Sequence, residues 1–125
     1  MERESSSRPE TPLKRGDIVL VPFPFTDLTT EKLRPAVIVS VDPQETDVVI
    51  AFISSIVPAG ELAKTDFLLS SNHPDFPKTG LKKASVFKLK KLLTIERTRT
   101  IRRLGNVSPT IQEELDKRLK GALGL

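Results

Sequence analysis

The chain has 125 residues, of which 38% are hydrophobic and 29% are charged, the proportions of one soluble globular domain. It has no cysteine, which excludes disulfides and thiolate nucleophiles, and its longest apolar run is far shorter than the ~18–20 residues of a membrane span. The polar first ten residues do not resemble a secretory signal, so we expect a cytoplasmic protein without membrane contact.

Residues 1–12 are rich in Ser, Glu and Pro and offer almost nothing to a core, so we interpret them as a flexible leader before a single domain at 13–125. A strand is predicted over 18–23, where apolar residues occupy both alternating faces, as in a strand covered on two sides. Pro22 and Pro24 cannot donate to a hydrogen-bond ladder, so the strand is expected to leave the sheet or lie at its edge there.

A long connection follows, from residue 23 to residue 32. Its length, aromatic residues and hydroxyls are typical of a loop that covers a substrate, which makes Phe25 and Thr26 candidate contacts. A phenylalanine in such a place also serves as a plain anchor to the core, so Phe25 is open to both interpretations.

Two apolar strands, 36–41 and 48–54, are separated by turn-forming residues and are predicted to pair as an antiparallel hairpin. Further strands are predicted at 65–70, 84–90 and near 93–97, with a surface loop at 71–83. The sequence ends in the clearest helix, which Ser108 caps and Pro109 begins, with apolar residues at helical spacing at Ile111, Leu115, Leu119 and Ala122. We expect a small, strongly bent sheet closed by one amphipathic helix.

Positive charge is concentrated in one segment. Residues 78–103 hold ten lysines and arginines and one acidic residue, Glu96. Such a local excess favours a polyanionic partner, bound less tightly as salt rises. The plainer interpretation is that strands carry charged outer faces to stay soluble.

The signatures of several enzyme classes are missing. His73 is the only histidine, and there is no HExxH motif, no glycine-rich phosphate loop and no carboxylate–histidine cluster with ligand spacing. We therefore expect no metal site and no cofactor, and the sequence disfavours metal-dependent hydrolysis and nucleoside triphosphate chemistry.

An arginine and a hydroxyl stand at corresponding ends of the predicted hairpin. Arg34 and Pro35 precede the first strand, and Ser54 ends the second, so pairing of the strands would turn a cation and a hydroxyl toward one pocket. A guanidinium grips a phosphate with two parallel donors, and RNA supplies its own nucleophile, the 2′-hydroxyl. Arg-Pro before a strand and Ser-Ser after one also occur commonly at ordinary strand ends. Spacing alone therefore leaves open whether these residues form a phosphate site or only mark the ends of strands.

Several segments resemble, in order, the PemK/MazF family of bacterial toxins, from about residue 14 to the end of the sequence. They are Arg15-Gly16-Asp17-Ile18-Val19, Arg34-Pro35-Ala36-Val37-Ile38-Val39-Ser40, Phe52-Ile53-Ser54-Ser55-Ile56, Gly80-Leu81 to Ser85-Val86, and Leu104-Gly105-Asn106-Val107-Ser108. The resemblance implies a mainly β fold, an SH3-like antiparallel barrel with a C-terminal helix, that forms a homodimer. It further implies a metal-independent endoribonuclease that cuts single-stranded RNA at short sequences, and an antitoxin partner whose acidic or disordered segment occupies the RNA groove.

Matched position by position, the resemblance implies that Arg34 and Ser54 are catalytic and act on the scissile phosphate while the 2′-oxygen attacks in line. The products would be a 2′,3′-cyclic phosphate and a 5′-hydroxyl. The family usually has threonine at the position of Ser54, so Ser55 is an alternative that shares the role. The predicted RNA contacts are Phe25, Thr26, Lys32, Ser55 and Lys90.

A second departure from the family lies in Lys88–Lys91, where many relatives carry an acid and a glutamine near Lys90 and Lys91. Lysines there predict a different base preference, or more contact with the RNA backbone and less base reading. Two other functions stay open: a gyrase poison resembling CcdB, which would act through its C-terminal helix, and a non-catalytic barrel that binds nucleic acid through its basic strands.

Overall fold

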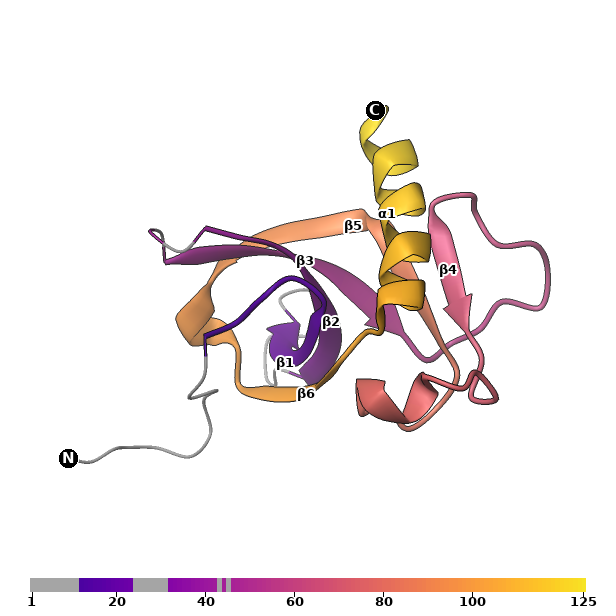
Figure 1. Ribbon diagram of the computed structural model, residues 1–125, viewed down its shortest axis with the longest axis horizontal. Helices are drawn as coiled ribbons and strands as arrows, with labels where there is room; N and C mark the ends of the chain where they lie inside the picture. The colour runs from indigo at the N-terminus through magenta and orange to yellow at the C-terminus, as the bar shows by residue number, and fades with distance from the viewer. Residues whose placement is uncertain (1–11, 24–31, 43, 45) are drawn as a thin grey trace.

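The computed structural model describes residues 12–23, 32–42, 44 and 46–125 (Figure 1). The strands are β1 (Asp17–Phe23), β2 (Lys32–Val41), β3 (Asp47–Ser54), β4 (Asp66–Leu69), β5 (Ser85–Glu96) and β6 (Arg102–Asn106), and they are followed by the helix α1 (Pro109–Leu123). Two short 3-10 helices, η1 (Phe76–Thr79) and η2 (Arg97–Arg99), lie in the connections. No helix of the described residues is long and apolar enough to cross a membrane.

The strands form one six-stranded sheet in the order β4-β5-β3-β2-β1-β6, and every neighbouring pair is antiparallel. The sheet curls into a half-barrel, and α1 stands beside β4 and β5 (Figure 1). The prediction of a mainly β, barrel-like fold with a C-terminal helix is confirmed.

Both faces of the central strands are buried, as the apolar pattern of 18–23 predicted. One core lies under α1 and includes Ile18, Val37, Ile53, Phe87 and Ile111. The other lies against the opposite face and is formed by Leu13, Val19, Val21, Ala36, Ile38, Val48, Ile50 and Phe52. Successive side chains of a strand point to opposite faces, so a strand between two cores is apolar at every position.

The predicted helix and hairpin are confirmed, with small differences at their ends. The Ser108 hydroxyl accepts the amide hydrogen of Ile111 at 3.3 Å, and Ile111 and Leu115 are buried. Strand β2 begins at Lys32 rather than Ala36, because its first residues pair with β1 as far as the Phe23–Lys32 pair.

Pro22 also behaves as predicted. Strand β1 has β6 beside it only over Asp17–Leu20, so Pro22 has a neighbouring strand, β2, on one side only. On the side where β6 is absent, the missing N–H of Pro22 therefore interrupts no hydrogen-bond ladder.

Three predictions about the second half of the chain were wrong or incomplete. The strands predicted at 84–90 and 93–97 are one strand, β5, because residues 89–91 bulge out without turning the chain. Strand β6 was missed, since its mostly half-exposed residues carry no alternating pattern. The segment 71–83 contains η1 and buries Thr79, so it is more closely packed than a surface loop.

The leader predicted at 1–12 lies outside the described residues except for Pro12. The predicted contacts Phe25 and Thr26 also lie outside them.

Candidate functional site

The candidate site lies where β2 and β3 part from one another. Their ladder runs from the Val41–Val48 pair to the Ala36–Phe52 pair and ends there. Pro35, the next residue of β2, has no N–H to donate, which prevents a regular continuation of the ladder. Arg34 and Ser54 lie beyond this last pair, one on each strand.

Each of these two residues is held by a strand on its outer side. Arg34 pairs with Val21 of β1, and Ser54 pairs with Val86 of β5. Because β1 pairs with β2 and β5 pairs with β3 at this point, β2 and β3 can separate from each other and still remain in the sheet. A cavity lies between them.

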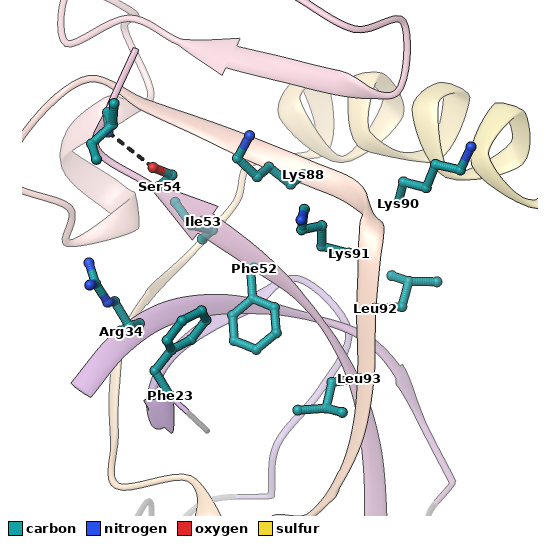
Figure 2. Close-up of a pocket in the computed structure, with 11 residues that line it drawn as sticks. Phe23, Arg34, Phe52, Ile53, Ser54, Lys88, Lys90, Lys91, Leu92 and Leu93 are labelled. Atoms are coloured by element: carbon teal, nitrogen blue, oxygen red, sulfur yellow. Dashed lines mark hydrogen bonds between the residues drawn. The ribbon is translucent and has the colours of Figure 1, made fainter. Parts of the chain in front are cut away.

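The cavity has a volume of ≈ 530 Å³, which lies in the ~300–1,000 Å³ range of small-ligand sites. Its described lining residues are Phe23, Arg34, Phe52, Ile53, Ser54, Ile56, Lys88, Lys90, Lys91, Leu92 and Leu93. Figure 2 shows Arg34 and Ser54 on the left and Lys90 on the right, with Lys88 and Lys91 between Ser54 and Lys90 and the rings of Phe23 and Phe52 below them. An apolar floor and a cationic rim suit a ligand with an anionic group and a flat apolar part.

The Arg34 side chain is exposed and lies over the aromatic ring of Phe23. Its Cζ atom lies 5.4 Å from the centre of the Phe23 ring. Phe23 in turn meets Phe52 edge-to-face, with ring centres 5.0 Å apart and an interplanar angle of 87°. A cation over an aromatic face contributes about 0.5–1 kcal/mol at an exposed site, so these rings bias the guanidinium toward the cavity.

The hydroxyl of Ser54 is oriented by the backbone. Its Oγ accepts the amide hydrogen of Ile56 at 3.1 Å. A hydroxyl has one hydrogen to donate in addition to its acceptor lone pairs, so the Ser54 hydrogen stays available to an anion in the cavity. Serine lacks the methyl group that restricts threonine, and the Ile56 amide supplies part of that restriction.

Two of the three lysines on the rim, Lys90 and Lys91, come from a bulge in β5. The pairing with β3 shifts from Ala51–Leu92 to Phe52–Lys88, so Leu89, Lys90 and Lys91 have no partner in β3. We call these three residues the β5 bulge. Bulges bend a strand and redirect its side chains. Lys88, beside the bulge, has its Nζ 3.8 Å from Oδ2 of Asp66.

The lining is strongly positive. Arg34, Lys88, Lys90 and Lys91 line the cavity, and its described lining includes no carboxylate and no histidine. His73 lies in the connection between β4 and β5, residues 70–84, where its Nδ1 accepts the Asp75 amide hydrogen at 3.0 Å. In the ranges that the structure describes, no three His, Cys, Asp or Glu side chains gather in a group suited to a metal ion.

Of the predicted site residues, the structure brings Arg34, Ser54 and Lys90 to one cavity. Lys32 and Ser55 are exposed, and neither is among the described lining residues.

Sequence reasoning missed the apolar floor, and it named the lysines of 88–91 only through the departure from the family pattern, without placing Lys88 and Lys91 in the site. Counting outward along the hairpin would have placed Phe52 two residues from Ser54 on the same face, whereas the redirection of Lys91 depends on a bulge that has no clear sequence signal.

Comparison with known proteins identifies the family to which the chain belongs. No curated protein sequence matches the chain significantly. Among solved structures, Mycobacterium tuberculosis toxin MazF-mt6 is similar with a TM-score of 0.67 and 20% identity, over 87% of this chain and 97% of that one. MazF from Deinococcus radiodurans gives 0.68 and 16%, over 93% of this chain and 100% of that one.

A third similar structure is an endoribonuclease in complex with its cognate antitoxin from Mycobacterial species, with a TM-score of 0.66 and 21% identity, over 92% of this chain and 97% of that one. At such identities the likeness shows a shared fold. The family model of the PemK-like, MazF-like toxins matches residues 14–123, nearly the whole described domain. The chain therefore belongs to the PemK-like, MazF-like toxins of type II toxin–antitoxin systems.

Proposed function

We propose that the protein is a metal-independent endoribonuclease toxin that cuts single-stranded RNA in the cavity between β2 and β3. The observation that carries this proposal is the convergence of Arg34 and Ser54 on one cationic cavity. Similar structures named as an endoribonuclease and as MazF toxins support the same activity. Gyrase poisoning and simple nucleic-acid binding require neither of these two residues.

In the proposed reaction, the guanidinium of Arg34 and the hydroxyl of Ser54 donate to the non-bridging oxygens of the scissile phosphate. The 2′-oxygen of the RNA forms a bond to phosphorus, and the bond from phosphorus to the 5′-oxygen breaks. The products are a 2′,3′-cyclic phosphate and a 5′-hydroxyl. Negative charge builds on the non-bridging oxygens in the transition state, so fixed donors there lower the barrier.

Two protons move in this reaction. The 2′-hydroxyl loses one and the departing 5′-oxygen gains one, and the described lining offers neither a histidine nor a carboxylate for these transfers. We assign both transfers to solvent. The protein then acts by positioning the phosphate and stabilising its charge.

The proposal includes partners and a location. A cognate antitoxin would place an acidic, partly apolar segment in the same cavity, whose cationic rim and apolar floor suit such a segment. The similarity to a toxin solved in complex with its antitoxin supports this partner. We further propose a cytoplasmic homodimer, on the basis of the family.

The test is cleavage of single-stranded RNA by purified protein in the presence of EDTA. We expect cleavage that leaves 2′,3′-cyclic phosphate ends, is lost in Arg34→Ala, and is blocked by a 2′-deoxy residue at the cut site. Lys117→Ala, on the exposed face of α1, is the matched control that retains activity. If the RNA stays intact and the protein instead blocks DNA supercoiling by gyrase, the result would support a gyrase poison.

A further inference from the structure

We propose that Lys90 and Lys91 bind a second phosphate of the RNA, adjacent to the scissile phosphate held by Arg34 and Ser54. This inference rests on the proposed function, because it assigns a neighbouring linkage of the same substrate to the same cavity. It makes the substrate an RNA segment recognised through at least two charged linkages.

The first support is the direction of the side chains. In a regular strand Lys91 would share the face of Leu89, which is fully buried. Lys88, Lys90 and Lys91 nevertheless all line the cavity. The β5 bulge accounts for this, because three residues without partners in β3 let the strand bend and turn Lys91 outward (Figure 2).

The second support is charge. Lys88 has a nearby carboxylate in Asp66, at 3.8 Å. Lys90 and Lys91 are exposed, and within the described ranges neither has a carboxylate oxygen within 4.0 Å. Two cations that line a cavity whose described lining has no carboxylate attract an anion, and the attraction is strongest beside a wall of low polarity. Leu92 and Leu93 provide such a wall next to the bulge.

The third support is the chemistry of lysine. An ammonium group is a point charge with donors only, so it cannot accept hydrogen bonds from the amino groups of bases. It contacts phosphate oxygens regardless of the base, which positions the strand without reading its sequence. These phosphate contacts should therefore contribute affinity and register.

The binding test uses a fully 2′-O-methyl RNA of mixed sequence, which lacks the nucleophile and is not cut. Its affinity is measured by fluorescence anisotropy over a range of salt concentrations. We expect the double variant K90Q/K91Q to bind about tenfold more weakly, with a salt slope smaller by about 0.7 for one lost phosphate contact. Lys117→Gln should match the wild type, and an unchanged Tm shows that the double variant is folded.

A cleavage test then locates the second phosphate. Neutral methylphosphonates replace one linkage at a time on either side of the cut site. In the wild type one flanking replacement should raise KM, and in K90Q/K91Q the same replacement should have no further effect. Loss of kcat with an unchanged KM in the double variant, or an unchanged salt slope, overturns the inference.

The two proposals fail separately. Salt-dependent binding that depends on the lysine pair, without any cleavage, rejects the ribonuclease proposal alone. Cleavage that needs Arg34 but ignores the lysine pair rejects the second phosphate site alone.

Discussion

Arg34 and Ser54 occupy mutually opposite positions, each two residues beyond Ala36 and Phe52, the last pair of the β2–β3 ladder. In a continued ladder their side chains would meet as neighbours on one face of the sheet. The strands part here, so the two side chains border a cavity. Two neighbouring strands thus place a cation and a hydroxyl at the border of the same cavity.

Phe23 should act as a positioning residue for Arg34. Phe23→Leu keeps apolar contact with Phe52 but removes the aromatic face under the guanidinium, so we expect kcat for RNA cleavage to fall about two- to fivefold. Phe23→Tyr should restore the rate. In an Arg34→Ala background the leucine substitution should have no further effect on single-turnover cleavage, and an equal loss in both backgrounds would contradict this role.

The hydroxyl of Ser54 should matter more than its size. Ser54→Ala removes one donor to the transition state, so we expect kcat to fall ~10²–10³-fold with little change in KM. Ser54→Thr keeps the hydroxyl and the acceptor for the Ile56 amide, and should stay within a few fold of the wild type. Both variants are measured by single-turnover cleavage of one RNA. A fully active Ser54→Ala variant would show that the Ser54 hydroxyl does not act on the scissile phosphate.

The rate of cleavage should rise with pH without the bell shape that a histidine produces near neutrality. The described lining of the cavity has no histidine, and His73 is engaged with the Asp75 amide elsewhere. His73→Ala should therefore leave the pH profile unchanged. A profile that flattens in His73→Ala would show that this residue transfers a proton.

Glu114 should give a small, pH-dependent contribution to stability. Hydrogen bonding to Arg118, aided by the charge of Lys117, lowers the pKa of Glu114 from its ordinary value. A lowered pKa in the folded state stabilises the protein above the ordinary carboxyl range and loses this effect as pH falls through the lowered value. Glu114→Gln should lower Tm slightly at pH 7 in low salt, and the difference should vanish in strong acid.

Gly105 should be required for the packing of β6 against η1. A Cβ atom there would lie 2.2 Å from the carbonyl oxygen of Lys78, and backbone cannot yield easily. We expect Gly105→Ala to destabilise the protein by about 1–3 kcal/mol in urea unfolding. Gly60→Ala, where a Cβ would meet nothing within 4 Å, is the control and should change stability by less than about 0.5 kcal/mol.

Some of the fold could be predicted because it depends on local pattern. Continuous apolar runs marked β1, β2 and β3, and Ser108 with Pro109 marked the start of α1. Strand β6 could not be found this way, because it is defined by pairing with β1 rather than by its own pattern. The two strands predicted near 84–97 are one because a bulge, unlike a turn, leaves no glycine or proline signal.

The sequence by itself determined the chemical groups of the candidate site, Arg34 and Ser54, and the strands that carry them, because residue type and periodicity are local properties. Tertiary structure decided which groups meet. The opening between β2 and β3, the aromatic support of Phe23 and the outward turn of Lys91 all depend on how distant strands pair. Strand register and bulges arise from contacts between segments far apart in the chain, and no local pattern encodes them.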